Sequence, residues 1–189
     1  MSYIIDLRRG KIKLLMFIVL FCAIIYIVFS ILIRAFFYPI KYETLVNKYS
    51  KQYELDSHLV FSIIRTESKF NPKAQSPKNA KGLMQITDKT GEWAAREIGI
   101  EGYSSEKLYD PEINIQMGCW YIKRLLIQYN NVDTALAAYN AGSGNVSKWL
   151  KNEEYSKDGE NLIIIPFKET REYVKKVSKA RIQYKRLYK

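Results

Sequence analysis

Apolar residues dominate one long stretch near the start of the chain. From Leu14 to Ile33 the sequence reads LLMFIVLFCAIIYIVFSILI, 20 residues without a charged side chain. At about 1.5 Å of rise per residue, a helix of this length matches the hydrocarbon core of a bilayer, which is about 30 Å thick. The pattern therefore predicts a membrane-spanning signal-anchor helix within residues 14–38.

Two other interpretations of this stretch are weaker. A cleaved signal peptide has an apolar core of about 7–15 residues followed by a small-residue cleavage site. Here the run is longer and continues into bulky residues such as Phe36 and Phe37. A lipoprotein signal that uses Cys22 is disfavoured as well, because Phe21 precedes this cysteine and the apolar run extends well beyond it.

Charges beside the apolar run predict its orientation. The preceding segment, residues 1–13, carries four basic residues against one acidic residue: Arg8, Arg9, Lys11 and Lys13 against Asp6. Positive flanks stay on the cytoplasmic side. We therefore expect a single-pass protein of the cell membrane with a cytoplasmic N-terminus and an extracytoplasmic domain in residues 39–189. Arg34 and Lys41 on the other flank reduce this asymmetry.

Beyond the membrane run, the apolar positions follow a helical period. Tyr42 to Tyr53 is predicted as one helix, and Asp56 or Ser57 is placed to cap the next. That second helix carries Val60, Ile63, Ile64 and Glu67 at positions i, i+3, i+4 and i+7, which share one face. A carboxylate thus ends an apolar stripe.

Further helices are predicted to the end of the chain, and no strand alternation stands out. Their signals are a Thr87 or Asp88 cap with a stop at Gly99, the start Asp110-Pro111-Glu112, an Asp133 cap with a stop at Gly142, and a possible turn or two at Asn145–Leu150. A basic tail helix repeats apolar residues at Tyr173, Val177, Ala180, Tyr184 and Leu187. The predicted fold class is all-α.

Composition excludes several kinds of chemistry. The 189 residues include one histidine, His58, and two cysteines, Cys22 and Cys119, of which the first lies in the membrane run. A disulfide within the domain is therefore excluded, as are zinc clusters and nucleophile systems that pair histidine with serine or cysteine. We expect no metal and no cofactor.

The net charge of +11 raises the question of an anionic partner. Nucleic acid suits such a surface, but a domain across the membrane from the genome rarely meets it, so we expect none. Anionic wall polymer or lipid headgroups are better candidates. A solvated helix face explains the charge more simply still.

Glu67 is the candidate catalytic residue. Burial against Ile63 and Ile64 disfavours the carboxylate and raises the pKa above its reference value of about 4.3. A carboxylic acid that stays protonated near neutral pH suits the cleavage of a glycosidic bond, as in lysozyme, where apolar surroundings raise a glutamate to about 6. The alternative from periodicity alone is a side chain that turns outward to pair with Lys69.

Three separated motifs favour the catalytic interpretation of Glu67. They are Glu67-Ser68, GLMQI at Gly82–Ile86 and AYNAG at Ala138–Gly142. In order and spacing they resemble the signature motifs of the soluble-lytic-transglycosylase-like (SLT) family, a goose-lysozyme-related group of peptidoglycan-cleaving enzymes. Two further segments, FNPKAQSPKNAKG and IPFKETREYV, are similar to that family as well. The resemblance covers about residues 42–184. Asn79 departs from the glycine often found at its position in a loop.

The resemblance implies a lysozyme-like α-helical domain with a glycan-binding groove. In the first wall, Gly82 is expected to let a sugar approach closely, Met84 to offer a polarisable surface and Gln85 to offer an amide. Gly82 also fits a plain glycine turn into a helix.

The second wall is expected to come from AYNAG. Tyr139 can pack on a pyranose face, Asn140 can bind an acetamido group, and Ala141 and Gly142 end the helix. By the same resemblance Glu169 and Tyr173 would face the site, although a glutamate at the start of a basic helix also fits an interaction with the helix dipole.

The mechanism that the resemblance implies uses one acid. Glu67 protonates the oxygen between N-acetylmuramic acid and N-acetylglucosamine, and then as a base it takes the proton of the muramyl 6-hydroxyl, which closes a 1,6-anhydro ring. Ser68 is placed to orient the carboxyl group. The expected partners are peptidoglycan glycan strands and, through Leu14–Ile33, the membrane.

Two rival functions stay open from the sequence. One is a lysozyme-like hydrolase on the same fold, in which water replaces the internal hydroxyl. The other is a wall-binding scaffold with an idle acid. An envelope-spanning, division or sporulation complex would each suit a tethered domain of this kind, and the sequence does not choose among them.

Overall fold

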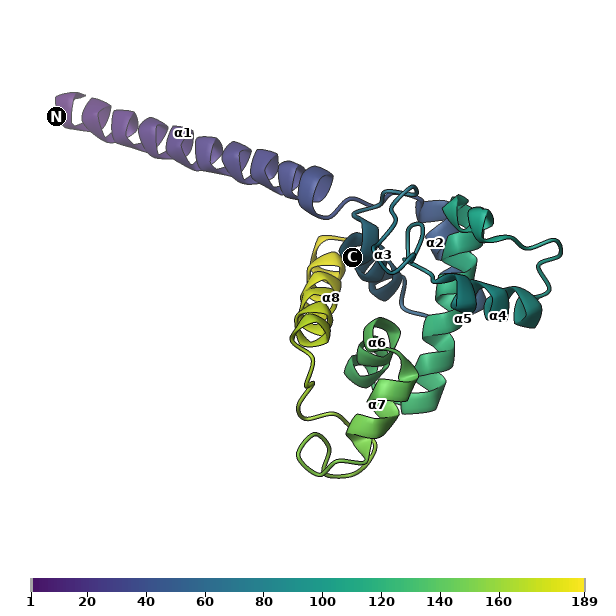
Figure 1. Cartoon of the computed structure of the whole chain (residues 1–189). Helices are drawn as coiled ribbons and strands as arrows, with labels where there is room; N and C mark the ends of the chain where they lie inside the picture. Colours follow the sequence, from purple (N-terminus) through teal and green to yellow (C-terminus); the bar gives the residue numbers. More distant parts are fainter. Residues whose placement is uncertain (1, 189) are drawn as a thin grey trace. The chain divides into compact units, whose positions relative to one another are not determined.

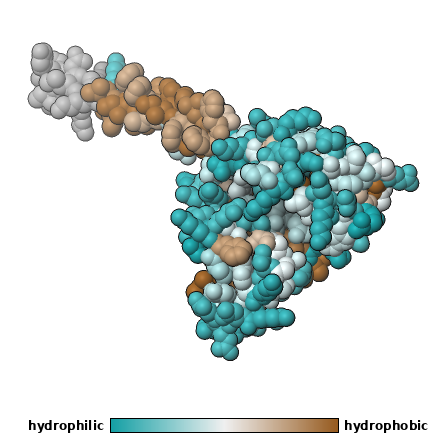
Figure 2. All heavy atoms as spheres, viewed as in Figure 1, coloured by the Kyte–Doolittle hydropathy of each residue, from teal (hydrophilic) through white to brown (hydrophobic). Residues whose placement is uncertain are grey.

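A computed structural model describes the backbone of residues 2–188 and the side chains of residues 12–188. The chain divides into two compact units, Met1–Pro39 and Ile40–Lys189 (Figure 1). The first unit consists of helix α1 (Ser2–Leu32), which runs into a short π-helical turn, η1 (Ile33–Phe37). Residues 12–37 form a candidate membrane span with a mean hydropathy of 3.1 and no buried residues in its most apolar part. The face of this helix seen in Figure 2 is mostly apolar, in line with its many exposed large hydrophobic side chains.

The second unit is helical, and it contains all of the sequence motifs. Its elements are α2 (Glu43–Gln52), α3 (Ser57–Ser68), α4 (Asp88–Ile98), the 3₁₀ turn η2 (Ser105–Tyr109), α5 (Pro111–Tyr129), α6 (Val132–Ala141), α7 (Ser143–Leu150) and α8 (Lys168–Leu187). No strand occurs in the part of the chain that the structure describes, where only isolated bridges at Gln75–Lys81 and Lys81–Ile86 are present. The all-α prediction is confirmed.

Most helices begin where the capping residues predicted. Asp56 accepts a hydrogen bond from the backbone N–H of His58, and Asp110 accepts one from Ile113 with Pro111 at the first helical position. The predicted Asp133 cap is wrong. Asn131 caps α6 by accepting from the N–H of Thr134 at 2.9 Å, since its own backbone is extended while Asp133 already lies inside the helix.

Helix α3 lies at the centre of the core. It packs against α2 and α8, while α5 packs against α2, α4 and α6. The predicted stripe of α3 is confirmed, because Val60, Ile63 and Ile64 have no exposed surface. The predicted apolar face of α8 is confirmed as well, apart from Leu187, which is half-buried. This packing fixes the last turn of α3, which carries Glu67, against the first turns of α8.

Candidate active site

Glu67 lies in the last turn of α3 and lines a pocket of about 300 Å³. Four separate parts of the chain form this pocket: the end of α3, the loop of residues 71–87, the end of α6 and the start of α8. Besides Glu67, the lining residues that the sequence predicted are Gln85, Tyr139, Asn140 and Glu169. We call this the Glu67 pocket.

The carboxyl group of Glu67 holds its proton more tightly than an ordinary glutamate. Burial raises its pKa, the phenol of Tyr173 lowers it, and the negative charge of Glu169 raises it again, with a result of about 7. The side chain turns into the pocket, which disagrees with the alternative of an outward ion pair with Lys69. At neutral pH a large fraction of Glu67 is therefore a neutral acid that can donate a proton.

Two phenols lie beside this acid. The hydroxyl of Tyr139 donates a hydrogen bond of 2.8 Å to the carbonyl oxygen of Met84. The hydroxyl of Tyr173 is buried near Glu67 but makes no hydrogen bond of standard geometry within the described residues. Burial, with the nearby Glu67 charge, raises the pKa of both phenols well above the usual value. Both side chains thus stay neutral, and the Tyr173 hydroxyl is a donor beside the Glu67 carboxyl group.

The GLMQI segment is positioned by its glycine and its methionine. Gly82 has a φ of +76°, and a Cβ atom there would overlap the Leu108 carbonyl and the Asn114 amide. The close approach at Gly82 is therefore to protein atoms. The Met84 side chain is fully buried with its sulfur against Gly118, so its thioether packs in the core, and the polarisable surface expected for a sugar is absent from the pocket lining.

Gln85 is the residue of this segment that reaches the pocket. Its backbone has a φ of +52°, and its Nε2 donates to the carbonyl oxygens of Gly82 (2.9 Å) and Ala74 (3.1 Å). The amide nitrogen is thereby fixed. The amide oxygen has no hydrogen-bond donor within residues 12–188, and Gln85 is one of the residues that line the pocket.

Ser68 is buried, and its hydroxyl lies 2.8 Å from the carbonyl oxygen of Leu83 and 3.1 Å from that of Ile64. The proton of one hydroxyl is shared between these two acceptors. Ser68 thus ties the end of α3 to the GLMQI segment, and it positions Glu67 through the backbone instead of through a bond to the carboxyl group.

The AYNAG segment ends α6 at the pocket wall. Asn140 accepts a hydrogen bond of 2.8 Å from the Thr170 hydroxyl, which leaves its amide NH₂ without a partner among the described residues. The Ala141 carbonyl accepts from Asn145 at 2.8 Å, and Gly142 breaks the helix with a φ of +86°. Asn140 therefore presents donors to the pocket, whereas Ala141 and Gly142 shape the chain that holds it.

Glu169 stands at the mouth of the same pocket, in the first turn of α8. It is largely exposed, and its carboxylate lies 3.8 Å from the Nζ of Lys78, which also lines the pocket. The sequence indicated that Glu169 would either face the site or complete the helix dipole, and its position allows both.

Two supporting residues were missed by the sequence analysis. Asn114 is fully buried; it accepts from the Met84 N–H at 2.7 Å and donates to the carbonyls of Leu108 (2.8 Å) and Lys81 (2.9 Å). Its signal was a polar residue directly beside Ile115 in an apolar helix. These bonds use the amide fully and hold the GLMQI segment in place.

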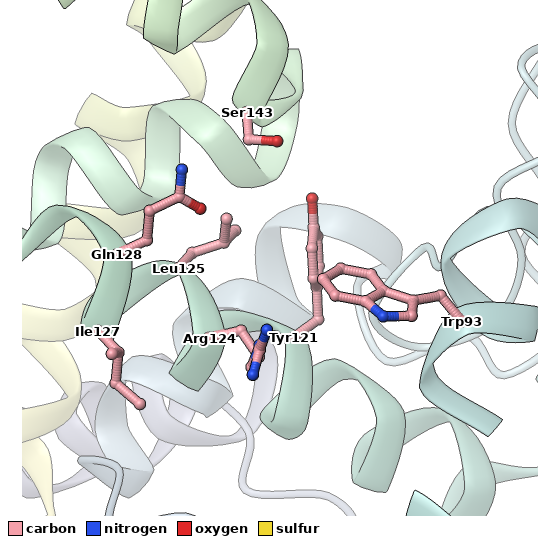
Figure 3. A pocket seen from close by; sticks show the side chains of 7 residues that line it. All are labelled: Trp93, Tyr121, Arg124, Leu125, Ile127, Gln128 and Ser143. Carbon is pink, nitrogen blue, oxygen red and sulfur yellow. The ribbon is translucent and has the colours of Figure 1, made fainter. Parts of the chain in front are cut away.

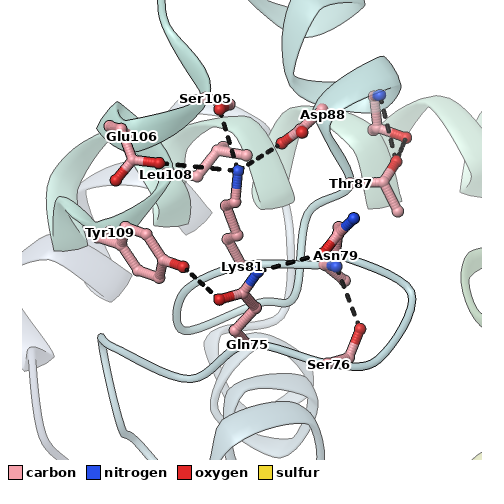
Figure 4. Close-up of polar contacts among 12 residues, drawn as sticks. Gln75, Ser76, Asn79, Lys81, Thr87, Asp88, Ser105, Glu106, Leu108 and Tyr109 are labelled. Atoms are coloured by element: carbon pink, nitrogen blue, oxygen red, sulfur yellow. Dashed lines mark hydrogen bonds and ion pairs between the residues drawn. The ribbon is translucent and has the colours of Figure 1, made fainter.

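Lys81 is the second of these residues (Figure 4). Its Nζ lies 3.0 Å from both Asp88 and Ser105, although only 8% of the side chain is exposed. In the same region the Tyr109 hydroxyl donates to the Gln75 amide oxygen at 3.0 Å. The loop of residues 71–87 is thus cross-linked to α4 and η2, and this makes one side of the pocket rigid.

The comparisons with known proteins agree with this geometry. The profile of the family described as "Transglycosylase SLT domain" matches residues 44–163. The chain belongs to the transglycosylase SLT domain family. The matched range contains the Glu-Ser, GLMQI and AYNAG motifs, and the resemblance found in the sequence is thereby confirmed.

Relatives of this SLT domain include soluble and membrane-bound proteins. The soluble lytic murein transglycosylase of Escherichia coli K12 is 41% identical over 143 residues, which are 74% of this chain and 22% of the relative. Membrane-bound lytic murein transglycosylase C of Haemophilus ducreyi is 34% identical over an alignment of 169 positions, which covers 76% of this chain and 45% of that protein. The chain therefore spans less than half of either relative.

Solved structures have the same fold. The 70 kDa soluble lytic transglycosylase of Escherichia coli matches with a TM-score of 0.69 and 36% identity, over 79% of this chain and 25% of that one. An inactive mutant of the lytic transglycosylase Slt from Pseudomonas aeruginosa matches with a TM-score of 0.70 and 34% identity, over 79% of this chain and 24% of that one. The lysozyme-like helical fold expected from the motifs is therefore confirmed.

Proposed function

We propose that this chain is a membrane-anchored lytic transglycosylase. It cleaves the β-1,4 bond between N-acetylmuramic acid and N-acetylglucosamine in peptidoglycan and leaves a 1,6-anhydromuramic acid end. The observation that carries the proposal is Glu67, whose pKa is raised to about 7 in a pocket lined by residues of all the family motifs. The names of the relatives, lytic murein transglycosylases, support the same reaction.

In the first step the neutral Glu67 gives its proton to the glycosidic oxygen as the bond to the muramyl C1 breaks. The sugar carbon then carries positive charge, which the acetamido group of the same sugar stabilises. A neutral acid is needed because the leaving oxygen departs poorly as an alkoxide. Tyr173, whose hydroxyl lies beside Glu67, stabilises the carboxylate that Glu67 has become.

In the second step the Glu67 carboxylate acts as a base. It takes the proton of the muramyl 6-hydroxyl, whose oxygen bonds to C1 and closes the anhydro ring. Glu67 is protonated again at the end, so proton and charge balance without water, metal or cofactor.

We assign substrate contacts to the polar groups that the pocket leaves open. The Gln85 amide oxygen accepts a hydrogen bond from an N-acetyl group, and the Asn140 amide donates one to an N-acetyl group. Tyr139 supplies a ring face for the sugar. Gly82, Met84, Ser68, Ala141 and Gly142 hold these groups in place and are assigned as supporting residues.

A hydrolase is the second candidate, and Glu169 is the observation that favours it. Retaining and inverting glycosidases use two carboxylates, and Glu169 brings a second one to the pocket. However, this side chain is largely exposed and lies next to Lys78, which suits charge tuning better than activation of a water. The transglycosylase reaction is thus the better supported of the two.

The proposed topology places residues 1–13 in the cytoplasm, 14–38 in the membrane and 39–189 outside. The apolar span at residues 12–37 and the basic flank support it. Such a tether suits an enzyme that opens the wall locally for an envelope-spanning, division or sporulation complex. Protease added to intact spheroplasts should remove the domain, whereas survival of the domain would contradict this topology.

The reaction is tested by digestion of purified peptidoglycan with the full chain in detergent micelles. Mass spectrometry of the released muropeptides should show anhydro ends. A hydrolytic muramidase, used as the control, gives products that are one water heavier. Release of the heavier products alone would overturn the transglycosylase assignment in favour of the hydrolase.

A further inference from the structure

A second pocket, of about 360 Å³, lies next to the Glu67 pocket and is lined by Trp93, Tyr121, Arg124, Leu125, Ile127, Gln128 and Ser143 (Figure 3). We call it the Trp93 pocket. None of the sequence motifs placed a functional residue in it. It is formed by α4, α5 and the start of α7.

The two pockets adjoin each other across an aromatic wall and along one segment of chain. The Tyr121 ring lies 5.3 Å from that of Tyr139, which lines the Glu67 pocket, and 6.3 Å from that of Trp93. Asn140 lines the first pocket and Ser143 the second, less than one helical turn apart in the sequence. The Trp93 pocket therefore lies within reach of a polymer that is bound in the Glu67 pocket.

The lining of the Trp93 pocket combines ring faces with polar groups. Trp93 stands nearly perpendicular to Trp120, at 4.7 Å, and this contact fixes its orientation. Figure 3 shows the Tyr121 hydroxyl and the Gln128 amide projecting toward Ser143. Aromatic rings with a few polar groups are typical of a sugar-binding surface.

Arg124 adds a positive charge to this lining. Its guanidinium carbon lies 5.6 Å from the Trp93 ring and 5.9 Å from the Trp120 ring, and the side chain is exposed. Among the residues whose side chains are described, no carboxylate forms an ion pair with it, so its charge is available to a ligand. These cation–π contacts hold the guanidinium near the rings, and its N–H groups can bind a planar anion.

We propose that Arg124 binds a carboxylate of the stem peptide carried by a muramyl residue of the glycan strand. The occupant of the Trp93 pocket is thus a peptide-bearing part of the same strand that is cut at Glu67. This inference rests on the proposed function, and it adds a specificity: the enzyme prefers strands that retain their peptides over strands stripped of them. Arg124 is a binding residue in this scheme and takes no part in the proton transfers.

The test compares two substrates and two arginine variants of the full chain in detergent micelles. The substrates are purified glycan strands with stem peptides and the same strands after an amidase has removed the peptides. Arg124→Leu removes the guanidinium from the Trp93 pocket. The matched control is Arg186→Leu, which removes an exposed arginine in the last turn of α8.

The readout is the ratio of kcat/KM on the two substrates, measured as anhydro ends formed. For an exposed ion pair we expect Arg124→Leu to lower this ratio about three- to fivefold relative to the wild type, through KM and not through kcat. Arg186→Leu should keep the wild-type ratio. Arg124→Lys keeps the charge without the planar guanidinium, so it should give a ratio between those of Arg124→Leu and the wild type.

The proposal is overturned if Arg124→Leu lowers kcat/KM equally on both substrates, because the arginine would then support the sugar-binding surface or the fold. It is also overturned if the wild type shows no preference for peptide-bearing strands. A wild-type chain that forms no anhydro ends on either substrate would contradict the proposed function itself. The two failures are therefore distinguishable.

Discussion

Helix α3 carries a carboxylate at each end, and the two have opposite properties. Asp56 caps its N-terminus and has a pKa lowered to about 2, whereas Glu67 in its last turn has a pKa raised to about 7. Both residues lie against the same partner, α8. The difference arises from the groups that α8 presents at each end and from the deeper burial of Glu67.

Asp56 forms ion pairs with cationic side chains. Burial on its own would raise the pKa of Asp56, but hydrogen bonds from Arg181 (2.7 Å) and Lys185 (3.0 Å) lower it by more. The N-terminal dipole of α3 also favours the charged form. This carboxylate fastens the C-terminal half of α8 to the start of α3.

Glu67 lies near the phenol of Tyr173 and the carboxylate of Glu169. Burial dominates its pKa, Tyr173 lowers the value only in part, and Glu169 raises it. The negative end of the helix dipole further disfavours a charge there. The comparison teaches that burial raises the pKa of both carboxylates, and that the cations of the packed neighbour overcome this rise at Asp56, whereas the phenol offsets it only in part at Glu67.

The largest expected effect comes from Glu67→Gln, which removes the proton donor and keeps the shape. The rate of anhydro-end formation should fall by about 10³-fold or more, because an amide cannot act as the acid or the base. Glu97→Gln, on the exposed face of α4, is the matched control and should keep wild-type activity. Activity of Glu67→Gln near the wild-type level would contradict the proposed role.

The same substitution should stabilise the fold at alkaline pH. The folded pKa of Glu67 lies above the unfolded value, so its contribution to stability is fully present below about pH 4.5 and is lost as pH rises through about 7. At pH 8, Glu67→Gln should raise the free energy of unfolding by about 2–3 kcal/mol. Urea unfolding at pH 8 and pH 4.5 checks this, and an equal change at both pH values would contradict it.

Asp56→Asn should act in the opposite direction. The amide can still cap α3, but it loses its charge pairs with Arg181 and Lys185, so the free energy of unfolding at pH 7 should fall by about 1–2 kcal/mol, since these partners are partly exposed. The folded pKa is depressed, so this contribution is present above about pH 4 and is lost as pH falls toward 2. A deficit that persists unchanged at pH 2 would point to a cause other than charge.

The smallest effect is a pair of opposite shifts in the pH profile of activity. Activity should decline above about pH 7 as Glu67 loses its proton. Glu169→Gln should move this decline to lower pH, because it removes a charge that raises the pKa of Glu67, and Tyr173→Phe should move it to higher pH. Since Glu169 is exposed, added salt should weaken its effect. Shifts of both variants in one direction would contradict this assignment of charges.

Much of the fold was predictable because its signals are local. The apolar run, the caps at Asp56 and Asp110 and the buried stripe ending at Glu67 depend on residues within about one turn of each other. The misplaced cap at Asp133 shows the limit of such signals, since Asn131 and Asp133 both suit a helix start and only the backbone angles separate them.

The supports of the site were less predictable. Asn114 gave only the weak signal of one polar residue in an apolar helix, and its role depends on carbonyls that the loop of residues 71–87 and η2 bring to it. Met84 was expected to be a surface residue of the groove, but Gly118 has no Cβ atom and so leaves room for the Met84 side chain in the core. Such placements follow from how distant elements pack.

The sequence by itself determined that an apolar helix precedes an all-α SLT domain and that Glu67 ends a buried stripe, because helix periodicity and motif spacing are written in neighbouring residues. Only the tertiary structure decided how acidic Glu67 is. Tyr173 and Glu169 lie about 100 residues further along the chain, and the packing of α8 on α3 brings them to the pocket. A pKa depends on distances through space, and those distances are set only when the helices pack together.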